Sequence, residues 1–217
     1  MSTHRSHWLA LPLLAVAGML AAFAPLPVFP TALADPEADT LAFMREEEKL
    51  AHDLYVALDD LYGLPVFSNL ARSESLHMQA MLTLLEAYGL PDPAAGKQPG
   101  EFSDPTLQAL YDNLLARAKE SPVEALRAAA LVEETDILDL QERLAQTDTP
   151  DITRAYHNLL QASGKHLRAF AQQIERQTGS KYEPELLDGS AYASLVDGAR
   201  PGGMGAGLRG RRGGRTW

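Results

Sequence analysis

Apolar residues recur at intervals of three and four along most of the chain, which is the spacing of one face of an α-helix. No alternating apolar and polar pattern of useful length predicts a β-strand. The fold class is therefore expected to be all-α. The pattern predicts four long helices and one short one, over residues 37–62, 69–88, 122–146 and 150–178, and over 105–119.

Glycine, proline and serine mark the predicted helix ends. Gly63, Gly89 and Gly179 follow the first, second and last long helices, where glycine commonly ends a helix. Ser68 is expected to cap the start of the second helix. The stretch Ser121-Pro122-Val123-Glu124 predicts a capping box with proline at the first helical position.

The lengths of the connections predict the topology. Few residues separate the first two long helices, and few separate the last two, so each pair is expected to form an antiparallel hairpin. Residues 89–121 join the two hairpins and contain the short helix, which is the length of a crossover. Residues 35–179 are therefore expected to form a four-helix bundle with a long crossover carrying a short extra helix.

Residues 1–34 have the organisation of a secretory signal peptide. A short basic start precedes the apolar run Trp8 to Phe23, and Ala32-Leu33-Ala34 has the small-residue pattern of a cleavage site. The alternative is a retained membrane anchor, but the apolar run is shorter than the roughly 20 residues that span a bilayer. The protein is expected to be periplasmic or secreted after cleavage near Ala34.

The C-terminal part of the chain changes in composition. Residues 180–197 are expected to form a docked or loose tail with one helical turn. Residues 198–217 are rich in glycine and arginine and contain no acidic residue, which predicts a disordered tail. The alternative is a basic arm that binds an anionic surface such as a membrane, an envelope polymer or nucleic acid.

Charge and cysteine content exclude several classes of protein. The net charge of −10 argues against sequence-specific or general nucleic-acid binding by the chain as a whole. The absence of cysteine from the sequence excludes disulfide scaffolds, cysteine-ligated zinc, iron–sulfur clusters and cysteine nucleophiles. Any metal bound here must use histidine, aspartate, glutamate and water.

Ionisable residues interrupt the apolar stripe of each long helix near its middle. Buried carboxylates without partners cost several kcal/mol each, and no basic residue shares these faces. Bound cations or protons must neutralise them. Oxygen ligands with two imidazoles and no thiolate suit iron or manganese, with zinc as an alternative. The interrupting residues are Glu48, Glu74, His77, Glu133 and His166.

The spacing of Glu74 and His77 strengthens this interpretation. Residues at i and i+3 lie on one face of a helix, so both side chains can reach one metal ion. Nearby methionines are expected to fill the core. The alternative is that their thioethers and an imidazole hold Cu(I). These methionines are Met44, Met78 and Met81.

These positions resemble the ferritin-like superfamily of carboxylate-bridged di-metal proteins over residues 40–175. That superfamily carries Glu on helices one and three and Glu-x-x-His on helices two and four. Glu48 followed by Tyr55 also resembles the rubrerythrin pattern. The chain is most similar to an exported ferritin-like family, domain-of-unknown-function family 2202. The stretches that carry this likeness are 45–51, 73–78, 133–140 and 163–170.

The resemblance implies a protein that binds two ions of iron or manganese, or a single ion. The expected function is an oxidoreductase of the peroxidase or ferroxidase type, acting on O2, peroxide or Fe(II). The alternative is a non-enzymatic envelope protein for metal binding, storage or stress response. Metal ions and small oxidants are the expected partners, and a homodimer is left open.

The chain departs from the superfamily at Ser163, where a fourth glutamate is expected. Glu48, Glu74 and His77 would form the first metal site. The second would use Glu133 and His166 and share Glu74. Its ligand set could be completed from the neighbouring residues Asp136 or Glu47, or by water. The centre is therefore an unequal pair, a single-metal site or a degenerate remnant.

Several neighbours of these residues have alternative interpretations. Tyr55 and Tyr156 are expected to face the site as packing residues, with a role as hydrogen-bond donor or redox relay as the alternative. Glu46 and Glu47 are expected on a solvated helix face. Glu134 competes with Glu133, because one residue turns about 100° around a helix. Two histidines, His52 and His157, are expected at the surface.

Overall fold

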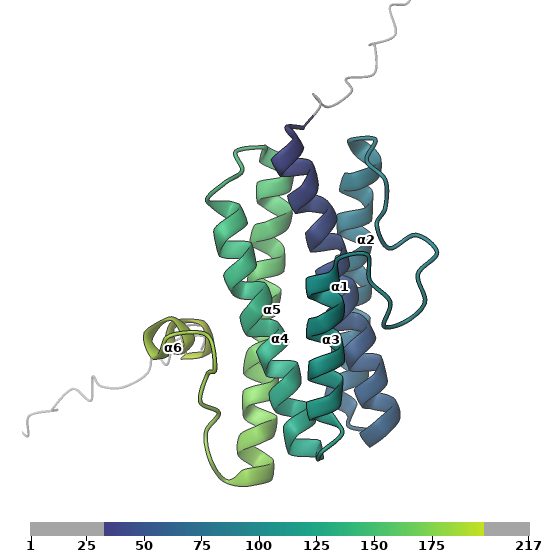
Figure 1. Ribbon diagram of the computed structural model, residues 1–217. Helices are drawn as coiled ribbons and strands as arrows, with labels where there is room; N and C mark the ends of the chain where they lie inside the picture. The colour runs from purple at the N-terminus through teal and green to yellow at the C-terminus, as the bar shows by residue number, and fades with distance from the viewer. Residues whose placement is uncertain (1–32, 198–217) are drawn as a thin grey trace, which may run out of the picture.

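The computed structural model describes residues 33–197, and every regular element within them is a helix. The all-α prediction is confirmed. The bundle is formed by four long helices, and two shorter ones lie outside it (Figure 1). The helices are α1 (Asp35–Tyr62), α2 (Pro65–Ala87), α3 (Pro105–Ala118), α4 (Pro122–Leu144), α5 (Pro150–Thr178) and α6 (Gly189–Asp197).

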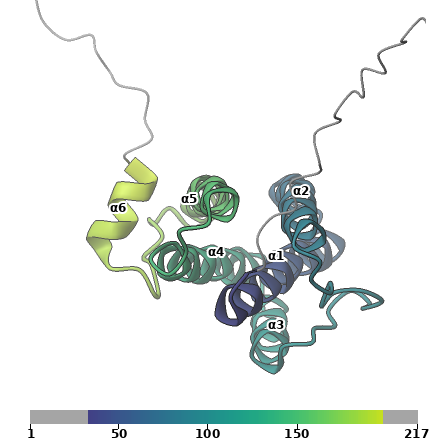
Figure 2. The same ribbon diagram turned by 90° about the horizontal axis from the view of Figure 1, so that it is seen from above.

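The long helices form two hairpins joined by a crossover, as predicted. Helix α1 packs against α2 and α4, and α5 packs against α4 and α2. The view along the bundle shows α3 outside α1, and α6 on the side of α4 and α5 (Figure 2). Residues 88–121 cross from one hairpin to the other and contain α3.

The apolar core is divided into two parts along the bundle. One part surrounds Leu54, Phe67 and Phe170 and extends to α3 and the C-terminal tail. The other includes Leu41, Leu85 and Tyr156 and lies towards the opposite end of the four long helices. The residues between these two parts on all four helices include the predicted ligands. The predicted site therefore forms a polar layer between two apolar ones.

One helix start and one capping box differ from the prediction, whereas α4 begins at Pro122 after Ser121 as predicted. Helix α2 begins at Pro65, because proline suits the first helical turn and the link from α1 is very short. Ser68 therefore lies inside the helix and does not cap it, so the predicted cap is wrong. The Ser121 hydroxyl accepts a hydrogen bond from the Glu124 amide at 3.1 Å. The Glu124 carboxylate pairs with Arg117 instead of completing a capping box.

Helix α1 is buried around its whole circumference from Met44 to Ala51, because the crossover and α3 cover its outer face. Lys49 donates hydrogen bonds to Asp53 and to the Gln98 carbonyl. The prediction that Glu46 lies on a solvated face is wrong. Glu46 is 2% exposed, and its carboxylate accepts hydrogen bonds from the backbone amides of Ser103 and Asp104, just before α3.

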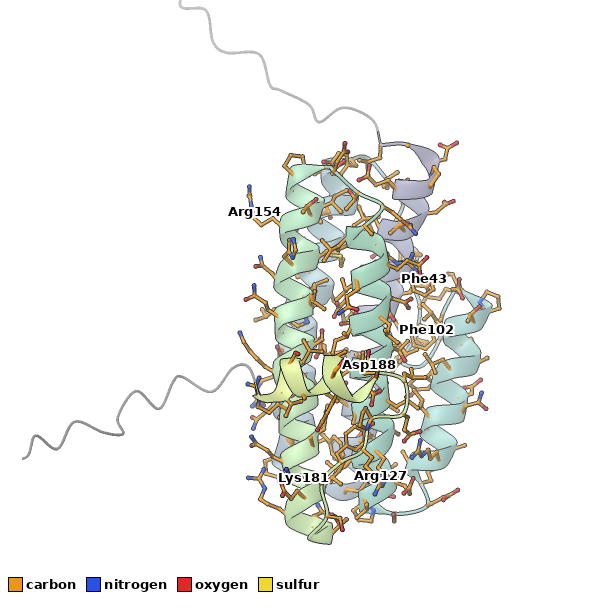
Figure 3. The ribbon with its side chains drawn as sticks, turned by 90° about the vertical axis from the view of Figure 1, so that its left-hand side faces the viewer. Phe43, Phe102, Arg127, Arg154, Lys181 and Asp188 are labelled. Carbon is orange, nitrogen blue, oxygen red and sulfur yellow. The ribbon has the colours of Figure 1, made fainter. Side chains whose placement is uncertain are left out.

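Residues 180–197 are docked on the bundle. Helix α6 has 9 residues, so it is longer than the single turn expected. It lies across the long helices, with Asp188 near its start (Figure 3). Arg168 of α5 donates hydrogen bonds to the Leu195 and Val196 carbonyls and so fixes the end of α6.

The two terminal predictions fall largely outside the described residues. Of the predicted signal peptide 1–34, the structure describes Leu33 and Ala34 alone, and the predicted disordered tail 198–217 lies wholly outside. Among residues 33–197, no helix combines the length and the apolar character needed to cross a membrane.

Candidate metal centre

The five residues predicted as ligands come together in the middle of the bundle. They form two groups in which one potential ligand atom from each residue lies within 4.8 Å of the others. The first group is Glu48, Glu74 and His77, and the second is Glu74, Glu133 and His166. Glu74 belongs to both groups. This is the arrangement expected if one carboxylate bridges two metal ions.

The first group joins α1 to α2. His77 Nδ1 lies 2.6 Å from Glu74 Oε2 and 3.2 Å from Glu48 Oε2. The Glu74 and His77 side chains meet because they are three residues apart on α2. The two carboxylates are almost completely buried, whereas the His77 side chain is 15% exposed. The imidazole therefore forms the edge of the site that is nearest to solvent.

The second group brings α5 and α4 to the same glutamate. His166 Nδ1 lies 2.7 Å from Glu74 Oε1 and 3.3 Å from Glu133 Oε1. The Nδ1 and Glu74 Oε1 atoms form this close ion-pair contact, and neither makes a hydrogen bond. The other ring nitrogen, Nε2, lies 3.1 Å from the Ser73 hydroxyl.

Buried atoms without partners indicate that the centre fits a cation. Glu48 Oε1, Glu74 Oε1 and His166 Nδ1 are all inaccessible to solvent and make no hydrogen bond. Leaving such atoms unpaired costs about 1–3 kcal/mol for each group, and more for charged groups. Cations held in the two groups would give each of these atoms a partner. Carboxylate and imidazole ligands without sulfur suit iron or manganese, in agreement with the residues predicted from the sequence.

The carboxylates keep both histidines protonated when no metal is bound. Burial opposes the charged form of His77, but its contacts with Glu48 and Glu74 outweigh this and raise its pKa to about 10. Burial likewise opposes the charged form of His166, and Glu133 and Glu74 raise its pKa to about 11. Both protons occupy ring nitrogens that would bind a metal ion. Metal binding must therefore displace them.

The pKa values of the three glutamates in the two groups shift in different directions. Burial raises the pKa of Glu48 well above its usual value, and the neighbouring charge of Asp136 adds to the effect. Burial also raises the pKa of Glu133. For Glu74, burial is outweighed by the two histidines, which lower its pKa to about 2. Among the acids of the two groups, Glu74 is therefore the one whose pKa favours the charged form.

Asp136 lies beside both groups, although it is a member of neither. Burial and the charge of Glu133 raise its pKa to about 8. The Ser163 hydroxyl donates a hydrogen bond to Asp136 Oδ2, and the Oδ1 atom has no partner. Ser163 therefore acts on a carboxylate of α4, at the position where the resemblance predicted a glutamate ligand.

The two tyrosines differ in their relation to the site. The Tyr55 hydroxyl donates a hydrogen bond to Glu133 Oε1 at 2.6 Å, and burial raises the pKa of Tyr55. Tyr55 thus orients a candidate ligand. Tyr156 makes no hydrogen bond to any of the five candidate ligands, and its buried hydroxyl is instead influenced by Arg143, Glu37 and Glu47. Tyr156 therefore differs from Tyr55 in having no hydrogen bond to a candidate ligand.

The other acids and histidines named from the sequence lie outside the two groups. Glu134 is fully buried about 100° around α4 from Glu133, where it binds the C-terminal tail, which favours Glu133 as the ligand. Glu47 is 2% exposed and stands outside both groups, so its expected solvated position is wrong. His157 is exposed, and His52 contacts Asp53 away from the centre. Sequence reasoning missed Ser73, which carries no periodic signal of its own.

The comparisons with known proteins identify the family. The model of an uncharacterized protein domain (DUF2202) matches residues 37–199. The chain belongs to the DUF2202 family. The resemblance to this family that the sequence carries is thus confirmed. The matched range includes all five candidate ligands, as well as Asp136 and Ser163.

A relative of this DUF2202 protein is known in structure. The uncharacterized protein MJ0754 of Methanocaldococcus jannaschii is 38% identical over 172 residues, which cover 79% of this chain and 92% of the relative. The crystal structure of hypothetical protein MJ0754 has a TM-score of 0.75 at 37% identity, covering 80% of this chain and 98% of that chain. At this identity and coverage, the two proteins share the helical fold.

Proposed function

We propose that this protein is an exported, ferritin-like metal-binding protein that holds two ions of iron or manganese. We propose further that it is an oxidoreductase acting on O2, peroxide or Fe(II). The observation that supports the proposal most strongly is that Glu74 is shared by two groups of buried ligand atoms. A bridging carboxylate between two sites of mixed oxygen and nitrogen ligands is the arrangement of carboxylate-bridged di-metal bundles.

The two ions would have unequal surroundings. Glu48, His77 and Glu74 would hold the first, and Glu133, His166 and Glu74 would hold the second. Asp136 would complete the second set, because its Oδ1 atom is buried and unpaired beside Glu133. Metal ions held in this way supply open coordination positions at which a small oxidant binds.

The protein residues would control access and charge around these ions. The His77 edge is the part of the site closest to solvent, so small molecules are expected to arrive on that side. Tyr55 would hold Glu133 in its orientation and place a phenol beside the second ion. Apolar layers above and below the polar layer would exclude bulk water.

A non-enzymatic function is the alternative, and Ser163 favours it. With serine in place of a fourth glutamate, the second group depends on Asp136 for its last carboxylate. If Asp136 does not bind, the protein would hold one metal ion firmly and act in metal binding, storage or stress response. The two functions differ in metal stoichiometry and in turnover.

Metal analysis of the purified protein, reconstituted with Fe(II) or Mn(II), tests both functions. About two ions per chain, with Glu74→Ala/His77→Ala binding none, would support the di-metal proposal. His157→Ala is the matched control, because this histidine is exposed on α5. Rapid Fe(II) oxidation or peroxide consumption would then support an enzyme. Unchanged metal content in the double variant would refute the site.

Export is a separate part of the proposal. It is supported by the order of a basic start, an apolar run and Ala32-Leu33-Ala34 in the sequence. The test is to fractionate cells that express the full chain and to sequence the N-terminus of the product. A new N-terminus at Asp35 in the periplasm or medium is expected. A full-length product retained in the cytoplasm would refute export.

A further inference from the structure

A second group of acids lies on α1 and α4, outside the two groups that contain histidine. Glu47 is 2% exposed, and neither of its carboxylate oxygens has a hydrogen-bond partner. Its charge is opposed by Asp136 and by Asp139, which is in contact with it. A buried carboxylate without a donor is costly, and two adjacent acids increase the cost.

A buried tyrosine on α5 provides an independent indication at the same place. Tyr156 is fully buried, and its hydroxyl has no hydrogen-bond partner. Besides burial, the charges of Arg143, Glu37 and Glu47 influence this hydroxyl. A water molecule held by a cation at Glu47 would provide the missing partner for the Tyr156 hydroxyl.

The available cationic side chain does not neutralise these acids. Arg143 follows Asp139 by one turn on α4, but its guanidinium stacks over the Phe43 ring with the Cζ atom 4.5 Å from the centroid. Arg143 makes no ion pair within residues 33–197, and its Nε atom is buried without a partner. Among residues 33–197, Glu47 and Asp139 therefore have no ion-pair partner of opposite charge.

We propose that Glu47 and Asp139 bind a third divalent cation, which keeps part of its hydration shell. The two carboxylates provide oxygen ligands alone, which suit Mg²⁺ or Mn²⁺ and need no imidazole. One or two carboxylates with several waters are typical of such sites. Asp139 is partly exposed, so a hydrated ion reaches the site from solvent without opening the bundle.

This site is separate from the proposed di-metal centre and does not depend on it. Its two ligands are absent from both groups that contain histidine. The all-oxygen ligand set also gives it a different metal preference. Mg²⁺ should compete with Mn(II) for the third site and should compete poorly for sites with imidazole ligands.

The test is a titration of the purified metal-free protein with Mn(II), with bound metal measured by electron paramagnetic resonance. In the His77→Ala/His166→Ala variant, one Mn(II) per chain should remain, and excess Mg²⁺ should displace it. Adding Glu47→Gln or Asp139→Asn to this variant should abolish that binding. Glu142→Gln is the matched control, because it removes a charge from an exposed position one turn along α4.

A second measurement covers the case in which the double histidine variant does not fold. In the otherwise unchanged protein, Asp139→Asn should lower the Mn(II) capacity by one ion per chain and remove the sensitivity to Mg²⁺. The same capacity and sensitivity in Asp139→Asn and Glu142→Gln would overturn the third site. If the unchanged protein and the His77→Ala/His166→Ala variant bound the same number of Mn(II) ions per chain, the di-metal centre would be refuted. The third site would remain supported.

Discussion

Ser163 of α5 donates its hydroxyl hydrogen to Asp136 of α4, across the interface between the second pair of helices. The family resemblance predicts a glutamate ligand at position 163. The structure instead has a small donor there that orients a carboxylate from the facing helix. Asp136 stands three residues after Glu133, so both acids point to the same side of α4. A carboxylate of α4 thus lies beside the centre where α5 supplies a serine.

Replacing Ser163 by alanine tests this relationship. Ser163→Ala removes the donor to Asp136 while leaving all five candidate ligands in place. Loss of a residue that orients a ligand typically weakens metal binding by about 10- to 100-fold. We expect that loss for the second ion alone, measured by competition with a chromophoric chelator.

Ser75→Ala is the control for this substitution. Ser75 is a serine on α2 whose hydroxyl bonds to the Ala71 carbonyl and does not contact the centre. The Ser75→Ala variant should bind metal with the same affinity as the unchanged protein. Equal metal affinity in Ser163→Ala and Ser75→Ala would show that Asp136 takes no part in the site.

Tyr55→Phe should destabilise the protein through Glu133. The substitution removes the hydroxyl that donates to Glu133 Oε1 at 2.6 Å and leaves a buried oxygen without that donor. Such a loss costs about 1–3 kcal/mol. The free energy of unfolding of the metal-free protein, measured in urea, should fall by this amount. Tyr62→Phe, which removes a hydroxyl bonded to the Ala118 carbonyl away from the centre, is the comparison for metal binding.

Metal binding separates the two tyrosine variants. Tyr55→Phe should also weaken the second ion, because Glu133 loses its orientation, whereas Tyr62→Phe should leave both ions unchanged. If both variants lost stability equally and neither lost metal, Tyr55 would be a packing residue alone.

The helices and the ligand set could be predicted from sequence because both depend on periodicity. Glu48, Glu74 and His77 interrupt apolar stripes whose spacing is visible in the chain, and the stripes of four packed helices converge. The link lengths predict the hairpins for the same reason: a short connection leaves two helices no other way to pack. The apolar stripes repeat regularly along each helix, and the link lengths are local features of the chain, so both can be read from the sequence.

The predictions that are wrong concern residues whose partners lie on segments without regular periodicity. Glu46 was expected in solvent, but the start of α3 brings two backbone amides to it. Glu134 competed with Glu133 for the same reason, since the tail that binds Glu134 has no periodic pattern. Ser68 was a plausible cap, but Pro65 begins the helix one turn earlier. Positions of the crossover and the tail are set by tertiary contacts that periodicity does not encode.

The stability of the metal-free protein should fall as pH rises above about 6. The folded-state pKa values of His77 and His166 are about 10 and about 11, against about 6.5 in an unfolded chain. The folded state therefore binds more protons in this interval, and the free energy of unfolding decreases with pH. Asp136, with a folded-state pKa of about 8, acts in the same direction. Glu74, with its pKa lowered to about 2, contributes in the opposite direction only below about pH 4.5.

Calorimetry of the metal-free protein between about pH 6 and about pH 9 measures this effect. We expect the melting temperature to fall by at least about 5 °C, because each kcal/mol corresponds to about 2–4 °C at this chain length. With Mn(II) bound, the decrease should disappear, since metal affinity rises as the ligands lose their protons. A parallel decrease with and without metal would contradict binding at these histidines.

Glu133→Gln and Glu134→Gln form a matched pair that distinguishes ligand from structural acid. Glu134 accepts hydrogen bonds from the Tyr182 hydroxyl and from the backbone amides of Glu185, Leu186 and Leu187. A glutamine amide would set an NH2 group against some of these donors, and leaving them unpaired costs about 1–3 kcal/mol. Glu134→Gln should therefore release residues 180–197 to protease and keep its metal.

Glu133→Gln should behave in the opposite way. It removes a ligand oxygen of the second group while leaving the tail contacts intact, so the second ion is lost and residues 180–197 remain resistant to protease. Limited proteolysis and metal analysis of both variants decide the matter: metal loss in Glu134→Gln with retention in Glu133→Gln would reverse the two assignments.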